Sequence, residues 1–322
     1  MWAAIALAGA SAILFASSIQ LARKVEQRFP AIGKFAEIDG VRIHYLEVEA
    51  GAAADLAPIL FIHGASGNAR DLHGAFAEPL AGRARMIFVD RPGAGYSARG
   101  GPADREVETQ ARYLAGLLAL LGIENAVIVG HSLGAAVSLA MAVTQPERVS
   151  ALMLVAPVSH PWPSRATTWY YSFANLPVIG EAFARLLAVP AGSLRYRAAV
   201  REVFAPSPVA DDYENRSATR LVLRPDSFIA NAQDVEAVHG GVSRISPRYP
   251  AIRIPVTVVT GDSDSTVRAD IHSDGLARDI AGARLVVLEK TGHMPTYAAT
   301  DRIIAEIETL NANLANSADT LD

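Results

Sequence analysis

Residues 126–134 read Ala-Val-Ile-Val-Gly-His-Ser-Leu-Gly, and they are the most informative segment of the chain for its fold. An apolar run typical of a buried parallel strand leads into Gly130-His131-Ser132-Leu133-Gly134, and residues 135–143 after it favour a helix. At a sharp turn from a strand to a helix, the glycines let the backbone bend and the serine hydroxyl rises above the sheet. The pattern therefore predicts that Ser132 is a nucleophile, and a serine that only caps the helix is the alternative.

Around this stretch, segments of strand length alternate with segments of helical periodicity, which indicates a parallel sheet with helices on both faces. The first two strands read as a hairpin that turns at Asp39-Gly40. The expected strands are residues 34–39, 41–48, 59–63, 85–90, 126–130, 151–156, 254–261 and 284–288. The expected helices are residues 70–81, 106–121, 135–143, 269–280 and 298–310.

The alternation stops between residues 158 and 250, where prolines are frequent and 11 of the 22 aromatic residues gather. We expect an inserted helical cap above the carboxyl ends of the strands, and aromatic side chains at a pocket entrance favour apolar ligands. The expected organisation is a membrane anchor at 1–23, a core in two parts at 34–157 and 251–314, a cap at 158–250 and a tail at 315–322.

A serine hydroxyl is a weak nucleophile unless a histidine takes its proton and a carboxylate orients that histidine. Among the eight histidines, His63 and His293 are the two that fall at strand ends on the expected catalytic edge of the sheet. His63 precedes Gly64 in a turn where the backbone is more useful than the ring. We therefore predict that His293, in the loop after the last strand, is the base.

The acid is expected at a strand end between the serine and the histidine. Asp262 and Asp264 follow the strand 254–261, whereas the ten residues after the strand 151–156 contain no carboxylate. We predict Asp264, because a short turn after Gly261 is needed to bring the carboxylate back towards the histidine. Asp262 is expected to cap that turn.

Attack by serine on a carbonyl creates an oxyanion, which needs two backbone N–H donors. We predict that these are the N–H groups of Leu133, the residue after the nucleophile, and of Ala65. Ala65 lies in the loop 63–68 after the third expected strand, where Gly64 and Gly67 permit a tight backbone path. An ordinary turn between a strand and a helix is the alternative for this loop.

Composition narrows the possible classes of function. The chain has no cysteine, which excludes disulfides, thiolate nucleophiles, cysteine-ligated zinc and iron–sulfur clusters. Its net charge is −4 and no basic face stands out, which argues against nucleic acid as a partner. With an apolar content of 51%, the chain can bury a full core. The expected chemistry uses no metal and no cofactor.

The first 22 residues suggest attachment to a membrane. Residues 2–22 carry no charge and are followed by Arg23, Lys24 and Arg28, and a helix of this length spans about 30 Å, the thickness of a bilayer core. We expect a single transmembrane helix with the catalytic domain on the cytoplasmic side, where the basic flank belongs. A cleaved signal peptide, with a secreted or periplasmic enzyme, and a soluble helix are the alternatives.

The motifs together resemble the α/β-hydrolase fold superfamily, in the branch with a helical cap. They occur in the family's order over residues 34–310, as His63-Gly64, Asp90-Arg91-Pro92-Gly93-Ala94-Gly95-Tyr96-Ser97, Gly130-His131-Ser132-Leu133-Gly134, Gly261-Asp262-Ser263-Asp264 and Gly292-His293. The resemblance implies an eight-stranded, mostly parallel sheet, supports Asp264 as the acid, and makes Asp90 and Arg91 residues that organise a loop. Serine in place of aspartate at position 132 argues against epoxide hydrolase and haloalkane dehalogenase activity.

The leading hypothesis is a serine hydrolase that cleaves a carboxylic ester of an apolar or lipid-like small molecule through an acyl-enzyme. Perhydrolase (haloperoxidase-like) and C–C bond hydrolase activity on the same triad are alternatives. A further alternative of a different class is a membrane-tethered binding protein that keeps the fold without turnover.

Overall fold

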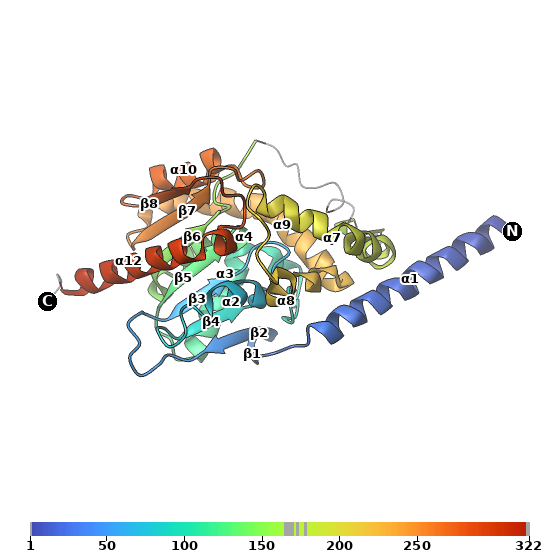
Figure 1. The fold of residues 1–322 in the computed structure, drawn as a ribbon, viewed down its shortest axis with the longest axis horizontal. Coiled ribbons are helices and arrows are strands. Elements are labelled where there is room, and N and C mark those ends of the chain that lie inside the picture. Colours follow the sequence, from blue (N-terminus) through green and yellow to red (C-terminus); the bar gives the residue numbers. More distant parts are fainter. Residues whose placement is uncertain (1, 164–170, 172–173, 177–178, 320–322) are drawn as a thin grey trace.

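The computed structural model describes residues 2–163, 171, 174–176 and 179–319, and an eight-stranded sheet forms its centre (Figure 1). The pairs β1–β2 and β2–β4 are antiparallel and the remaining pairs are parallel. In spatial order the strands are β1 (Lys34–Ile38), β2 (Val41–Val48), β4 (Met86–Val89), β3 (Ile59–Ile62), β5 (Ala126–His131), β6 (Val149–Val155), β7 (Val256–Gly261) and β8 (Arg284–Leu288).

The hairpin at the sheet edge turns where the sequence predicts. Asp39 and Gly40 both have positive φ angles, 50° and 77°, as a two-residue turn that matches the strand twist requires. The eight strands confirm the predicted α/β-hydrolase fold class and its mostly parallel sheet.

Helices cover both faces of the sheet: α2 (Ala69–Phe76), α3 (Val107–Leu120), α4 (Leu133–Thr144), α10 (Ala269–Asp279), α11 (Pro295–Ala298) and α12 (Thr300–Asp319). Successive side chains of a strand point to opposite faces, so each buried strand contributes to two cores. Leu60 and Ile62 pack in the core with α3 and α4, whereas Ile59 and Phe61 pack with α2 and α12. The apolar strands predicted from sequence are apolar throughout because both faces are covered.

Helices also fill the stretch between β6 and β7, which we call the cap (residues 158–250); its residues 164–170, 172–173 and 177–178 lie outside the described part. The described elements of the cap are α6 (Ile179–Phe183), η3 (Ala184–Ala188), α7 (Val189–Phe204), α8 (Tyr213–Ser217), η4 (Thr219–Leu223), α9 (Pro225–Ile245) and η5 (Ser246–Ala251). The last of these, η5, ends one residue after the cap. Val238, Val242 and Ile245 of α9 join the core that contains α4, which seats the cap on the nucleophile's helix.

Two terminal segments differ from expectation. At the C-terminus, α12 continues to Asp319 and so includes residues 315–319 of the expected tail, where no glycine or proline interrupts the helix. At the N-terminus, the uncharged segment forms α1 (Trp2–Arg28), which projects from the body (Figure 1). The prediction of a transmembrane helix is not supported. None of the described helices is long and apolar enough to cross a membrane.

The last turn of α1 is attached to the cap. Phe29, just after the helix, is 2% exposed and packs against Leu221, and Arg28 forms an ion pair of 2.6 Å with Glu214. The hydroxyl group of Tyr96, a residue of the core, donates a hydrogen bond to the Phe29 carbonyl at 2.5 Å. The C-terminal part of α1 is therefore held by contacts that reach both the core and the cap, and α1 also packs against the cap elements η3 and α7.

Candidate active site

Ser132 occupies the turn between β5 and α4 in a conformation that few non-glycine residues adopt, with φ 54° and ψ −119°. The glycines on either side permit close packing of the helix. A Cβ on Gly130 would lie 2.3 Å from Ser138 Oγ, and one on Gly134 would lie 2.1 Å from the Ile62 carbonyl. Backbone strain of this kind is typical of functional sites, and here it presents the Ser132 hydroxyl at the end of the sheet.

The structure brings Ser132, His293 and Asp264 together from three loops. His293 Nε2 lies 3.0 Å from Ser132 Oγ, and His293 Nδ1 lies 2.7 Å from Asp264 Oδ2. These contacts let the serine donate to Nε2 while the Nδ1–H donates to the carboxylate, which is the tautomer that a general base requires.

Asp264 is the carboxylate that faces the histidine. Burial raises its pKa, but the hydrogen bond with His293 and the N–H groups of Thr266 and Val267 outweigh this and lower the pKa below its usual value. Asp262 is exposed and bonds to Ser263 Oγ at 2.8 Å, away from the histidine. The ionised Asp264 is thus placed to orient and stabilise the imidazole.

The loop after β3 lies against the nucleophile. A Cβ on Gly64 would be 3.0 Å from Ser132 Cβ, so the residues around Ala65 border the serine. Within the described residues, no acceptor takes a hydrogen bond from the backbone N–H of Ala65 or of Leu133. Both predicted donors therefore remain available to a ligand oxygen near Ser132.

The arrangement of Ser132, His293, Asp264 and the loop after β3 agrees with the similarity of the chain to known proteins. The model of the α/β-hydrolase fold family matches residues 57–298. The chain belongs to the α/β-hydrolase fold family. The 2-hydroxymuconate semialdehyde hydrolase of Pseudomonas putida is 32% identical over 248 residues, which are 71% of this chain and 83% of that protein. The chain is therefore a hydrolase.

Solved structures share the fold of this hydrolase. A thermophilic esterase from Thermogutta terrifontis superposes with a TM-score of 0.66 at 23% identity. The aligned part is 88% of this chain and 99% of the esterase chain. A membrane phospholipase A, described as a bacterial virulence factor, has a TM-score of 0.68 at 21% identity and covers 98% of this chain and 95% of its own.

The loop-organising roles implied for Asp90 and Arg91 agree with their contacts in the hydrolase. Asp90 accepts hydrogen bonds from the N–H groups of Ala69 at 2.6 Å and Tyr96 at 2.7 Å, and it contacts His44 Nδ1 at 2.6 Å. Burial raises its pKa, but the contact with His44 outweighs this and lowers it.

His63, the alternative base, is held away from the serine. Its Nδ1 donates to the Gly64 carbonyl at 2.8 Å and its Nε2 accepts from the Arg91 N–H at 3.1 Å. Burial and the nearby Arg91 lower the pKa of His63 to about 3, so the ring is neutral. Both ring nitrogens are used to shape the loop, whereas the sequence analysis assigned the useful role at this position to the backbone.

Sequence reasoning missed the role of His131. The ring of this nucleophile neighbour donates from Nε2 to the His293 carbonyl at 2.9 Å, and burial lowers its pKa to about 4, which keeps it neutral. The His293 N–H in turn donates to the Val203 carbonyl of cap helix α7 at 3.0 Å. The base is therefore held by the core and the cap together, which local sequence periodicity does not reveal.

Asp71 is a second buried carboxyl near the oxyanion loop. Burial raises its pKa to about 7, and a hydrogen bond from Tyr213 offsets only part of that rise. Its Oδ1 has no hydrogen-bond partner among the described residues. In that same part of the chain, no three His, Cys, Asp or Glu side chains gather in a way that could hold a metal ion.

Proposed function

We propose that this hydrolase cleaves carboxylic esters through an acyl-enzyme on Ser132. The observation that carries the proposal is the contact series Ser132–His293–Asp264, at 3.0 and 2.7 Å. Beside it lie two backbone N–H groups for which the described part of the chain offers no acceptor. A nucleophile, a base with an orienting carboxylate and a preorganised oxyanion hole are the parts that acyl transfer needs.

In the proposed mechanism, Ser132 Oγ attacks the ester carbonyl while His293 Nε2 takes its proton. Asp264 stabilises the imidazolium that forms, and the N–H groups of Ala65 and Leu133 hold the oxyanion. His293 then protonates the leaving alcohol, which departs and leaves Ser132 acylated. Water activated by His293 attacks the acyl-enzyme and releases the carboxylic acid.

The substrate class that we propose is apolar, because the cap is rich in aromatic and aliphatic residues close to the base. Met294, next to His293, packs with Phe204 and Tyr213 of the cap. A series of chromogenic esters of increasing acyl length tests this proposal. Faster turnover of longer acyl chains is expected, and the absence of turnover for every ester would refute ester hydrolysis.

Cleavage of a C–C bond is a second candidate. It is favoured by the relative that is 32% identical and is named a 2-hydroxymuconate semialdehyde hydrolase. Loss of the visible absorbance of 2-hydroxymuconate semialdehyde, compared with turnover of the ester series, distinguishes the two reactions. Covalent labelling of Ser132 by a fluorophosphonate is expected in both cases.

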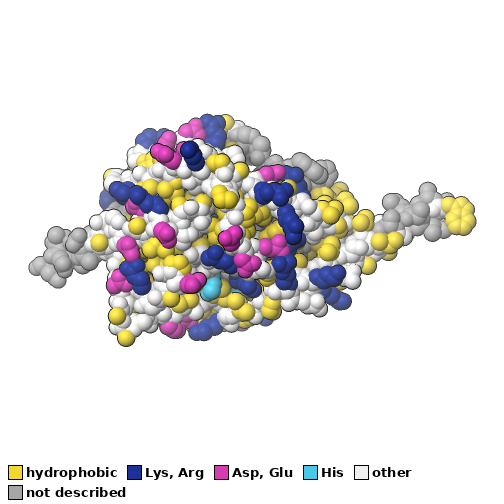
Figure 2. Space-filling view, viewed as in Figure 1, with side chains coloured by type: hydrophobic (Ala, Val, Ile, Leu, Met, Phe, Trp, Pro, Cys, Tyr) yellow, Lys and Arg dark blue, Asp and Glu magenta, His cyan; other side chains and the backbone are white. Residues whose placement is uncertain are grey.

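We also propose that α1 attaches the hydrolase to the surface of an anionic membrane. Support comes from large apolar side chains left in solvent on α1 and on the neighbouring cap, such as Trp2 (80% exposed), Ile13 (69%) and Leu194 (90%). Figure 2 shows hydrophobic side chains along the projecting helix. Exposed Arg23, Lys24, Arg197 and Arg201 form no ion pair among the described residues, and such cations attract anionic lipid headgroups.

A further inference from the structure

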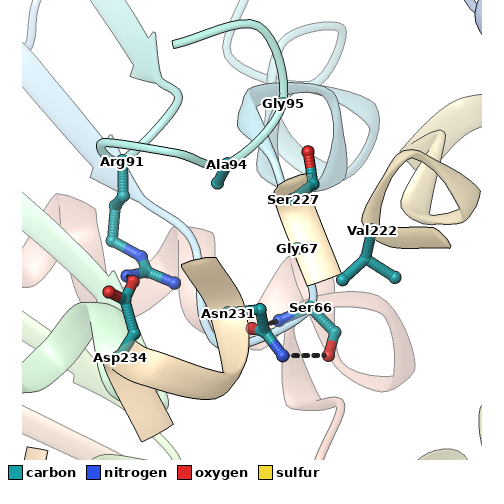
Figure 3. A pocket seen from close by; sticks show the side chains of 9 residues that line it. All are labelled: Ser66, Gly67, Arg91, Ala94, Gly95, Val222, Ser227, Asn231 and Asp234. Carbon is teal, nitrogen blue, oxygen red and sulfur yellow. Dashed lines mark hydrogen bonds and ion pairs between the residues drawn. The ribbon is translucent and has the colours of Figure 1, made fainter. Parts of the chain in front are cut away.

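Cap helix α9 faces the loop that carries one of the oxyanion donors. Figure 3 shows Asn231 and Asp234 of α9 beside Ser66 and Arg91, lining a small pocket at the boundary between cap and core. The two α9 residues are three positions apart, so they lie on the same face of the helix. That face is directed at the loop of residues 63–67.

Asn231 contacts the loop directly. Its side-chain oxygen accepts a hydrogen bond from the Ser66 N–H at 2.6 Å, and its Nδ2 donates to Ser66 Oγ at 3.3 Å. Ser66 has a φ of 61°, a left-handed conformation that is uncommon for a residue with a side chain. Such conformations persist where neighbouring groups hold them, and Asn231 supplies that hold.

Asp234 acts on the loop through Arg91. Arg91 Nη1 donates to Asp234 Oδ2 at 2.5 Å, while Arg91 Nε and Nη2 donate to the carbonyls of His63 and Gly64 at 3.0 and 3.1 Å. The side chains of Arg91 and Asp234 are 1% and 2% exposed. A buried pair of this kind is strongly attractive and leaves the guanidinium little freedom to turn.

The planarity of the peptide bond transmits both contacts to Ala65. The Gly64 carbonyl and the Ala65 N–H belong to one planar peptide unit, so fixing the carbonyl fixes the direction of that N–H. The Ala65 carbonyl and the Ser66 N–H belong to the next unit, which Asn231 holds. The two peptide planes on either side of Ala65 are therefore both tied to α9.

We propose that Asn231 and Asp234 are positioning residues of the cap that orient the Ala65 N–H towards the oxyanion, so that the oxyanion hole is complete only when α9 is seated. This inference rests on the proposed acyl transfer at Ser132. It assigns the cap a part in stabilising the transition state, in addition to covering the site.

The test compares Asn231→Ala with Gln233→Ala, a change on the same helix at a residue whose side chain contacts Arg99 at 3.3 Å and does not touch the loop. Each variant and the full-length parent are assayed with an ester and with the matching thionoester, whose sulfur is a poor hydrogen-bond acceptor. Asn231→Ala is expected to lower kcat for the ester roughly 10–100-fold, less than the loss of a whole oxyanion donor. KM should stay within about twofold, since substrate binding in the ground state uses other contacts.

The ratio of ester to thionoester turnover separates positioning from general structural damage. Asn231→Ala is expected to reduce this ratio, whereas Gln233→Ala should leave it unchanged. If Asn231→Ala slows the turnover of both substrates by the same factor, the ratio is unchanged and the proposal is overturned. If Asn231→Ala does not fold, Asp234→Asn, which keeps an acceptor for Arg91 but removes the charge, is expected to reduce the same ratio.

A second measurement keeps this inference separate from ester hydrolysis. If the parent turns over no ester, the proposed function fails, but fluorophosphonate still reacts with Ser132 and places its phosphoryl oxygen in the oxyanion hole. Asn231→Ala is then expected to slow this labelling roughly 10–100-fold relative to Gln233→Ala. Equal labelling rates would overturn the positioning role.

Discussion

His293 is held at three points: its Nδ1 faces Asp264, its carbonyl accepts from His131 and its N–H donates to Val203. These contacts fix both the tautomer and the orientation of the ring before substrate arrives. Preorganisation of this kind is why single changes in a triad are costly and why their effects do not add.

Removal of the nucleophile or base provides the first prediction. Ser132→Ala and His293→Ala are each expected to lower ester turnover by about 10⁴–10⁶-fold, because either change disables the same proton transfer. Steady-state kinetics with circular dichroism as a check on folding measures this loss. Turnover within about tenfold of the parent in either folded variant would show that the reaction uses another nucleophile or base.

The two neighbouring carboxylates provide a matched pair. Asp264→Asn is expected to lower kcat by about 10⁴-fold, since the amide would favour the wrong tautomer of His293. Asp262→Asn should change kcat little, because its side chain is exposed and contacts Ser263 instead. The same kinetic assay on both variants decides the assignment, and a larger loss in Asp262→Asn would reverse it.

Asp71 makes stability depend on pH. Its pKa of about 7 in the folded chain lies above the usual value near 4, so the folded chain keeps a proton that the unfolded chain releases. Stability from this group is therefore complete below about pH 4 and is lost as pH rises towards 7, by up to about 4 kcal/mol. Between pH 5 and pH 8, the free energy of unfolding is expected to decrease less in Asp71→Asn than in the parent. Urea unfolding of both proteins at pH 5 and at pH 8 measures this decrease. The same decrease in the two proteins would contradict the raised pKa of Asp71.

At the scale of elements, the approach of α4 to β3 depends on the absence of a side chain at Gly134. Nothing but hydrogen fits there, because a Cβ would meet the Ile62 carbonyl at 2.1 Å. Gly240, on α9, is an exposed helical glycine whose Cβ would meet only the end of the Arg244 side chain at 3.5 Å.

Alanine at these two positions is expected to have opposite effects. Gly134→Ala should lower the free energy of unfolding by roughly 1–3 kcal/mol, since the helix must move away from the strand. Gly240→Ala should raise it by about 0.5–1 kcal/mol through the helix propensity of alanine. Chemical denaturation of both variants measures the difference. Equal stabilities would mean that α4 does not pack as closely as the distances imply.

At the scale of the whole molecule, the projecting α1 and the adjacent cap present apolar and basic side chains in the same region. We expect the full-length protein to sediment with phosphatidylglycerol vesicles, and about 0.5 M salt to weaken this binding by screening the basic residues. A chain that begins at Gln27 keeps Phe29 in its buried site and should remain in the supernatant.

Two controls accompany this experiment. The shortened chain should hydrolyse a water-soluble ester at a rate similar to that of the full-length protein, since α1 contributes no residue to the triad. Alkaline carbonate should release the full-length protein from the vesicles, as expected for a helix at the lipid surface. Equal sedimentation of the two chains would exclude α1 as the attachment, and resistance to carbonate would contradict attachment at the surface alone.

The order of motifs allowed much of the fold to be predicted. Apolar runs of strand length, each followed by a helical period, are local signals, and covered strands produce them wherever they occur. The turn at Ser132, the loop at Ala65 and the ends of the last strands therefore identified the residues that the structure places near one another. The choice of Asp264 over Asp262 also depended on a short-range argument, the direction of the turn after Gly261.

The prediction of a transmembrane helix at the N-terminus is not supported, since none of the described helices is long and apolar enough to cross a membrane. The strand–helix alternation, the nucleophile turn and the order of the serine, acid and histidine can be predicted from the sequence, because these features depend on neighbours along the chain. The contacts of Asn231 and Asp234 with the oxyanion loop, and the support that His131 gives to the base, become visible in the folded chain alone. Asn231 and Ser66 are 165 residues apart, and contacts at that separation are set by how whole elements pack, not by any local pattern.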